Sequence, residues 1–170
     1  MKTSAGILVY RRKNGQLEVF IAHMGAPWWA KKDQGAWSIP KGEYDENEEP
    51  LAAAKREFKE ELGQLAPQGK YIKLGSIKQK NNKEVKAWAV ESGLDVSKIK
   101  SNTFKAEWPP RSGKMQEFPE IDRAEWMSLE QAAPKLVPGQ AEFLKRLAAK
   151  LNLPFEPGPE EEKPAQGSLF

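Results

Sequence analysis

The chain has 170 residues, a net charge of +3 and an ordinary composition of 39% hydrophobic and 30% charged residues. This size suits one domain with a single core, and the absence of cysteine excludes disulfides, thiolate nucleophiles and Cys-ligated metals. No apolar run reaches the roughly 18 residues that a membrane-spanning helix needs, so we expect no membrane association and a cytoplasmic location.

The first part of the chain predicts a β-hairpin followed by a third short strand. Residues 4–12 and 17–24 are apolar runs joined by Asn14-Gly15, a dipeptide typical of tight hairpin turns. The short N-terminal apolar run ends in two arginines, which favours a strand over a signal peptide. Residues 25–35 are expected to form a loop, and Ala36–Ile39 a strand that stops at a proline.

A helix is predicted from Pro50 to the residue before Gly63. Proline suits the first helical turn, Glu48 and Glu49 favour the positive end of the helix dipole, and glycine is a common C-terminal cap. Apolar residues recur at helical spacing and should form the buried side. They are Leu51, Ala54, Phe58 and Leu62.

The second half predicts two further strands, an irregular segment, a short strand and two helices. Residues 92–122 are rich in Pro, Gly and charge, and such a long loop in a small domain serves function or is mobile. The regular elements are strands 70–79, 84–91 and Ala124–Met127 and helices Leu129–Lys135 and Gln140–Leu151. This order predicts an α/β fold, a mixed sheet with helices on both faces.

The chain changes character at Pro154. Residues 154–170 are rich in Pro and Glu and are predicted to be a disordered acidic tail behind a domain of residues 1–153. The final residues, Gln166–Phe170, resemble the short peptide with which bacterial proteins bind the replication sliding clamp. The alternative is a plain chain end with two apolar residues.

Negative charge is concentrated in one segment of this basic chain. Between Glu43 and Glu61 stand eight acidic and three basic residues, a net charge of −5, so the remainder carries +8. An acidic focus in a basic protein suits a cation together with an anionic ligand. The alternative is that the same charge distribution reflects two solvent-exposed faces of different charge that bind nothing.

Residues 42–64, GEYDENEEPLAAAKREFKEELGQ, contain the decisive motif. The segment resembles the sequence motif of the Nudix family, the Nudix box. The matching positions are Gly42, Glu48, Arg56, Glu57, Phe58, Glu60, Glu61 and Gly63. Only Gln64 departs, at a position beyond the helix where an apolar residue is usual. The resemblance covers about residues 3–150 and implies the Nudix α/β/α sandwich with a mixed β-sheet.

The charged residues of this motif make chemical sense without the family name. Glu57, Glu60 and Glu61 are spaced at i, i+3 and i+4, so their side chains share one face of the helix. Their mutual repulsion calls for a cation, and ligands with oxygen donors alone favour Mg2+, with Mn2+ as a substitute. Such an ion binds diphosphate oxygens and activates water.

The resemblance implies further roles around these catalytic and metal-binding carboxylates. It makes the Gly42 carbonyl a metal ligand, Arg56 a residue that orients a carboxylate, and Glu48 a link between loop and helix or a ligand through water. Gly63 ends the helix. Family members recruit one more Glu before a strand that bears a Trp, here Glu120 or, alternatively, Glu117.

The residues before the motif suggest a substrate. The WSIPKGE sequence resembles the branch that cleaves dinucleoside or diphosphoinositol polyphosphates, and Lys41 would place a cation beside the metal for a long phosphate chain. The sequence therefore predicts a Nudix pyrophosphohydrolase that acts on a nucleotide or polyphosphate. Two alternatives stay open, namely a non-catalytic nucleotide sensor and a pyrophosphohydrolase of RNA 5′ ends, and the oligomeric state is undetermined.

Overall fold

The computed structural model describes residues 2–80 and 82–159. Its strands are β1 (Lys2–Lys13), β2 (Gln16–Met24), β3 (Trp37–Ser38), β4 (Lys41–Glu43), β5 (Ile72–Gln79), β6 (Lys83–Glu91), β7 (Thr103–Glu107), β8 (Met115–Pro119) and β9 (Ile121–Ser128). Its helices are α1 (Pro50–Leu62), α2 (Leu129–Ala132), α3 (Ala141–Lys150) and the short 3-10 helices η1 (Pro27–Trp29) and η2 (Val96–Lys98).

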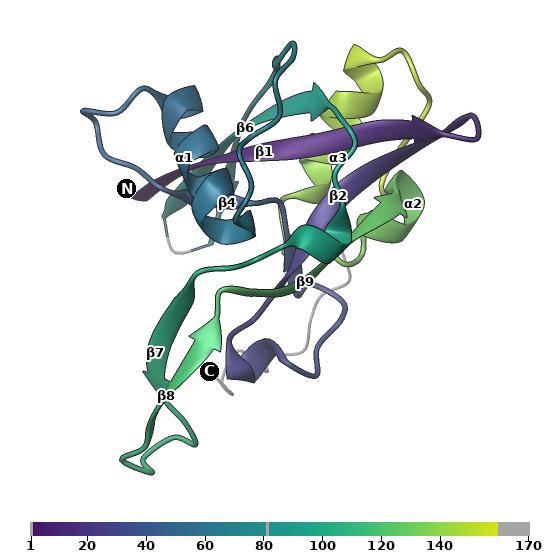
Figure 1. The fold of residues 1–170 in the computed structure, drawn as a ribbon. Helices are drawn as coiled ribbons and strands as arrows, with labels where there is room; N and C mark the ends of the chain where they lie inside the picture. Colours follow the sequence, from purple (N-terminus) through teal and green to yellow (C-terminus); the bar gives the residue numbers. More distant parts are fainter. Residues whose placement is uncertain (1, 81, 160–170) are drawn as a thin grey trace.

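A mixed seven-stranded sheet forms the centre of the molecule (Figure 1). Strand β1 pairs parallel with β6 and antiparallel with β2 and β4, while β5 and β9 extend the sheet on β6 and β2. The predicted hairpin is confirmed, because Asn14 and Gly15 take the positive φ values of 53° and 76° that a tight turn between β1 and β2 requires.

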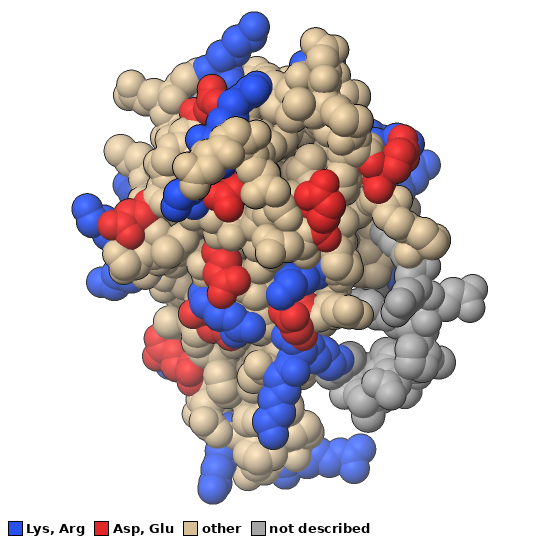
Figure 2. All heavy atoms as spheres, turned by 90° about the vertical axis from the view of Figure 1, so that its right-hand side faces the viewer, with Lys and Arg blue, Asp and Glu red and all other residues tan. Residues whose placement is uncertain are grey.

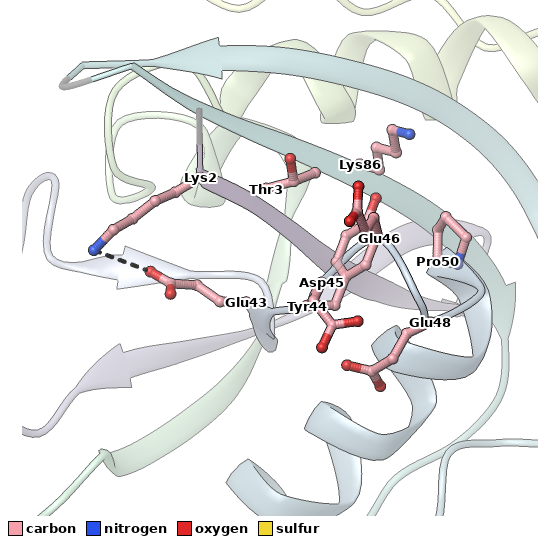
Figure 3. Close-up of a pocket in the computed structure, with 9 residues that line it drawn as sticks. All are labelled: Lys2, Thr3, Glu43, Tyr44, Asp45, Glu46, Glu48, Pro50 and Lys86. Carbon is pink, nitrogen blue, oxygen red and sulfur yellow. Dashed lines mark ion pairs between the residues drawn. The ribbon is translucent and has the colours of Figure 1, made fainter.

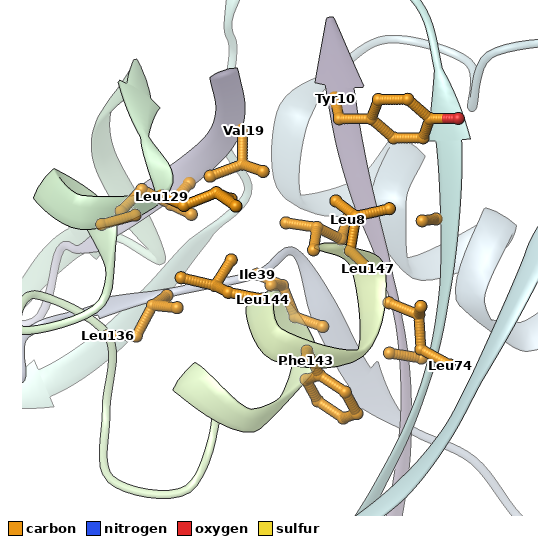
Figure 4. Packing of buried hydrophobic residues seen from close by; sticks show 14 of the residues in the cluster. Leu8, Tyr10, Val19, Ile39, Leu74, Leu129, Leu136, Phe143, Leu144 and Leu147 are labelled. Carbon is orange, nitrogen blue, oxygen red and sulfur yellow. The ribbon is translucent and has the colours of Figure 1, made fainter. Parts of the chain in front are cut away.

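Alternate residues of β1 face two separate hydrophobic cores. Ile7 and Val9 face a cluster with the buried side of α1, whereas Leu8 and Tyr10 face a cluster with α3. Figure 4 shows the second cluster, in which Leu8 lies among the side chains that α3 contributes. Helices thus cover both faces of the sheet, and the predicted α/β/α sandwich is confirmed.

The irregular segment predicted for residues 92–122 is partly wrong. Strands β7 and β8 pair with each other as a separate two-stranded sheet, which extends away from the body in Figure 1. We call residues 103–119 the arm. Its strands alternate polar and apolar residues, but the prolines and glycine of the connecting turn dominate the local composition and hide this pattern.

Smaller corrections concern helix ends and burial. Helix α2 ends at Ala132 rather than Lys135, since Pro134 has no N–H with which to continue the helical hydrogen bonds. On α1, Leu51 is only half-buried, and Ala53 joins the buried side instead. Helix α3 buries Phe143, Leu144 and Leu147 as predicted, with Leu151 half-buried at its end.

The C-terminal boundary stays a prediction. Phe155 packs partly against the core and Glu156 forms a 3.3 Å ion pair with Lys145, so residues just beyond 153 still contact the domain. The clamp-type peptide Gln166–Phe170 lies outside the described residues. Across the described ranges, no helix combines the length and hydropathy needed to cross a membrane.

Candidate active site

Helix α1, which carries the motif carboxylates, is fixed at both ends. The Glu49 side chain accepts hydrogen bonds from two backbone N–H groups of the first turn, at 3.2 and 2.8 Å, and Pro50 occupies the first helical position. Gly63 adopts the left-handed region at φ 70°, and its N–H donates to the Lys59 carbonyl at 2.8 Å. A Cβ atom on Gly63 would lie 2.5 Å from the Lys100 carbonyl oxygen, so a side chain is excluded.

Arg56 connects the helix to the loop before it. Its Nε and Nη2 atoms each donate to a carboxylate oxygen of Glu48 at 3.0 Å, a bidentate pair, and Nη1 donates to Glu57 at 2.7 Å. A longer contact of 3.5 Å reaches Glu60. These hydrogen bonds raise the pKa of Arg56, with Glu48 contributing most. Arg56 therefore anchors the loop through Glu48 and fixes the direction of Glu57.

The Glu57 carboxylate lies against Gly42. A Cβ atom at position 42 would fall 2.0 Å from the Glu57 carboxyl carbon and from one of its oxygens. Strand β4 is held there because Gly42 pairs with Ala5 of β1. Burial raises the pKa of Glu57, and the hydrogen bond from Arg56 opposes this. Only glycine leaves room for this carboxylate, which explains the residue type at position 42.

Glu61 is the most perturbed carboxyl of the site. Burial raises its pKa to about 8, although the charge of Lys41 and a hydrogen bond donated by the Lys41 backbone N–H both lower it. Burial also lowers the pKa of Lys41, with Glu61 opposing. Lys41 is thus a half-buried cation beside the carboxylates rather than a lysine on an exposed turn.

Glu120 joins the site from the junction of β8 and β9. Its backbone N–H donates to the Asn102 carbonyl at 2.8 Å, and its carbonyl accepts from Gly25 at 2.9 Å. Burial and the charge of Glu60 raise its pKa, and its own charge raises the pKa of Glu57 and Glu61. The alternative, Glu117, instead accepts a hydrogen bond from Thr103 within the arm.

The charges of Glu57, Glu60, Glu61 and Glu120 therefore act on one another's pKa, so the four carboxylates lie in one region of the structure. Within residues 2–80 and 82–159, no three acidic or histidine side chains already converge as a metal-binding group. The donor set fits a hard divalent cation, because it offers only oxygen atoms, and a cation would offset the burial that raises these pKa values.

The raised pKa of Glu61 predicts a pH-dependent stability. A folded-state pKa of about 8 against an ordinary 4.5 means that the folded protein holds a proton that the unfolded chain releases. Stability should fall as pH rises from about 4.5 to 8. We expect the melting temperature in EDTA to drop between pH 6 and 8.5, and Glu61→Gln to flatten this drop. If the melting temperature of Glu61→Gln fell with pH as steeply as that of the wild type, Glu61 would not be the group responsible.

Two surface grooves flank the helix. The first, of about 710 Å³, lies between the start of β1, β6 and the loop before α1 (Figure 3). Lys2 forms an ion pair with Glu43 across it at 3.9 Å. Glu48 lines this groove, but Glu57, Glu60, Glu61 and Glu120 do not. The groove is therefore separate from the candidate active site.

The second groove, of about 740 Å³, borders the carboxylates directly, because Glu60 is one of its walls. Lys55 and Lys59 from α1 and Asn102 from the segment before the arm also line it. The sequence interpretation missed these two lysines as site residues. The available signal was their spacing of i and i+4, which places the two lysines on one face of the helix.

His23, the single histidine, has a structural environment. Its ring is fully buried, with Nδ1 2.8 Å from the Asp122 carboxylate and Nε2 2.6 Å from the Lys32 carbonyl oxygen. Both ring nitrogens are thereby used in joining β2 to its neighbours.

Comparison with known proteins agrees with this geometry. The RNA pyrophosphohydrolase of Bartonella henselae is 33% identical over 147 residues, which covers 72% of this chain and 79% of that protein. The structure of the C. elegans Ap4A hydrolase binary complex matches with a TM-score of 0.62 and 22% identity, covering 89% of this chain and 98% of that chain. The NUDIX domain of Shewanella oneidensis NrtR complexed with ADP ribose matches with a TM-score of 0.57 and 11% identity, covering 88% and 87%.

The structural matches show the shared fold, and the family model makes the assignment. The model of the NUDIX domain matches residues 1–147, which include the whole sheet, helix α1 and Glu120. The motif that the sequence displays between Gly42 and Gly63 lies inside this match, on the helix where its carboxylates gather. The chain therefore belongs to the Nudix hydrolase family.

Proposed function

We propose that this Nudix pyrophosphohydrolase cleaves dinucleoside polyphosphates. The observation that carries the proposal is that cations lie next to the carboxylates at two places. Lys41 lies beside Glu61, and the groove with Lys55 and Lys59 opens beside Glu60. A phosphate chain that continues past the cleaved bond could contact both cationic sides, whereas a short chain would reach one. The fold shared with an Ap4A hydrolase supports the proposal.

A divalent cation, Mg2+ or Mn2+, fits the carboxylates Glu57, Glu60, Glu61 and Glu120, with the Gly42 carbonyl as a further ligand in the family scheme. When bound, it would supply charge neutralisation on the diphosphate and activation of the attacking water. Arg56 contributes by holding Glu57 in position.

The chain's own residues perform the remaining steps. A water oxygen attacks phosphorus, and Glu57 or a neighbouring carboxylate accepts the water proton. The bond from phosphorus to the bridging oxygen breaks, and the leaving phosphate takes that oxygen and its electron pair. Lys41, Lys55 and Lys59 hold the phosphates on either side of the reacting phosphorus by charge.

A substrate panel tests the proposal. Diadenosine tetraphosphate, ATP, dGTP, ADP-ribose and a 5′-triphosphorylated RNA oligonucleotide are each incubated with the protein and Mg2+, and products are resolved by chromatography. We expect diadenosine tetraphosphate to give the highest kcat/KM and chelator to abolish turnover. A plain nucleoside triphosphate with the highest kcat/KM would overturn the proposal.

The RNA oligonucleotide is included because one relative favours it. The Bartonella protein, 33% identical, is an RNA pyrophosphohydrolase. An RNA 5′ end is therefore the second candidate substrate. If the oligonucleotide outcompetes diadenosine tetraphosphate in kcat/KM, removal of diphosphate from RNA replaces the first proposal.

Lys41→Ala tests the role of the half-buried cation beside Glu61. We expect kcat/KM for diadenosine tetraphosphate to fall about tenfold, roughly the effect of one phosphate contact in a half-buried site, and kcat/KM for ATP to fall less. Lys2→Ala is the matched control, because Lys2 is exposed and lines the separate groove. Equal losses for both substrates in Lys41→Ala would show that Lys41 does not distinguish chain length.

The tail peptide Gln166–Phe170 remains a proposal about recruitment. If it binds a bacterial sliding clamp, a labelled peptide of the last ten residues should bind purified clamp and lose binding in a Leu169→Ala, Phe170→Ala double variant. Absence of binding at tens of micromolar clamp would end the idea. A chain cut after residue 159 should keep wild-type turnover in either case, because the described core ends before that point.

A further inference from the structure

Four aromatic side chains meet on one side of the arm. Phe104 of β7 lies directly opposite Phe118 of β8, with ring centroids 6.1 Å apart. Trp28 of η1 lies 6.4 Å from Phe104 and 6.4 Å from Trp108. We call these four residues the aromatic cluster. All four remain half-buried, so the rings keep surface that the protein itself does not cover.

The root of the arm is bonded to the catalytic helix. The Asn102 N–H donates to the Glu60 carbonyl at 3.2 Å, and the Asn102 carbonyl accepts from Glu120 at 2.8 Å. Glu120 directly follows Pro119, the last residue of β8. The backbone of Pro119 approaches Gly25 so closely that a Cβ atom on Gly25 would lie 2.2 Å from the Pro119 carbonyl oxygen. The aromatic cluster thus begins two residues, at Phe118, from a carboxylate of the active site.

The outer part of the arm carries unpaired positive charge. Lys105, Arg111 and Lys114 are exposed, and none forms an ion pair among residues 2–80 and 82–159. The two acidic residues of the arm are engaged locally, since Glu107 accepts from the Arg111 backbone and Glu117 from a threonine. Figure 2 shows basic side chains at the lower end of the molecule, where the arm lies in Figure 1.

Aromatic surface next to unpaired cations is suited to nucleotides, because bases stack on aromatic rings and phosphates are attracted to the cations. We propose that the aromatic cluster binds the nucleobase of the nucleotide on the far side of the cleaved linkage, with the cations of the arm attracting its phosphates. The inference rests on the proposed function, because it names the second nucleoside as the group that the enzyme selects.

The test compares two substrates with the same number of phosphates. Diadenosine tetraphosphate carries a nucleoside at each end, and adenosine 5′-tetraphosphate carries one. For Trp108→Ala and Phe104→Ala we expect kcat/KM to fall at least about tenfold for the first and to stay within about twofold for the second. Trp108→Phe should restore much of the loss, because a stacking ring is retained.

Met115→Ala is the matched control. Met115 belongs to the same hairpin and pairs with Glu107. Glu107 is an odd number of residues from Phe104 and Trp108, so Glu107 and Met115 face the other side of the arm. Met115 is 64% exposed. It should leave both substrates unchanged. Equal losses for both substrates in the aromatic variants would show a general effect on the site and overturn the inference.

Binding without turnover separates this inference from the proposed function. Calorimetric titration of diadenosine tetraphosphate in EDTA should show weaker binding for Trp108→Ala than for wild type, whether or not either substrate is hydrolysed. Unchanged affinity would overturn the aromatic-cluster inference while leaving the hydrolysis proposal intact. The same titrations with a 5′-triphosphorylated oligonucleotide and with GTP test whether the bound base belongs to RNA. In that case Trp108→Ala should weaken binding of the oligonucleotide and leave binding of GTP unchanged.

Discussion

Glu61→Gln is expected to lower kcat at least ~10²-fold, a few kcal/mol of barrier. Glutamine keeps the shape of the side chain but removes the negative charge that would bind the cation. The Glu61→Gln variant should still fold, because burial already raises the pKa of Glu61 to about 8 and favours its neutral form. Initial rates with diadenosine tetraphosphate, at a fixed Mg2+ concentration that saturates the wild-type protein, measure the effect.

Glu60→Gln should show a loss of the same order, and Glu130→Gln serves as the control, since Glu130 is an exposed residue in the first turn of α2. Raising Mg2+ tenfold should recover part of the activity of the Glu60 and Glu61 variants if the substitutions weaken ion binding. Near-wild-type turnover in both would refute their assignment as metal ligands.

Gly42→Ala is expected to reduce kcat by a similar ~10²-fold, although it adds only a methyl group. That methyl group would lie 2.0 Å from the Glu57 carboxyl, so either Glu57 or strand β4 must move. Displacing Glu57 also strains its 2.7 Å hydrogen bond with Arg56. A shift of about 1 Å in a catalytic group can cost about a hundredfold in rate.

Gly93→Ala is the control for this substitution, because a Cβ atom there meets nothing within 4 Å. The two variants should differ strongly in turnover and only slightly in melting temperature. If Gly42→Ala retained full activity, the close approach of β4 and Glu57 would not matter for catalysis.

The helix and its carboxylates could be predicted because their arrangement is local. Spacing at i, i+3 and i+4 fixes which side chains share a helix face, whatever the rest of the chain does. The C-terminal cap at Gly63 follows from the rules for helix ends, whereas Glu49 was predicted only to favour the helix dipole and the structure shows that it also caps the helix. The hairpin at Asn14-Gly15 was predictable for the same reason.

Glu120 shows the limit of local reasoning. It stands some sixty residues from the helix, and its distance from Trp126 could not decide between it and Glu117. The proximity of Glu120 to Glu60 arises only in the folded chain, where β9 pairs with β2 and the Glu120 carbonyl accepts from Gly25. The aromatic cluster was hidden likewise, because Trp28 and Trp108 lie eighty residues apart and meet only in the folded chain.

The end of α1 depends on residues far along the sequence. Helices leave their last carbonyls without partners, and here Lys100 donates to the Leu62 carbonyl at 3.0 Å and Asn102 to the Glu60 carbonyl at 3.2 Å. We therefore expect the last turn of α1 and the root of the arm to open together as one cooperative unit. In native-state hydrogen exchange, the amide protons of Lys100 and Asn102 should be as slowly replaced as those at the end of the helix, and more slowly than those of the outer arm.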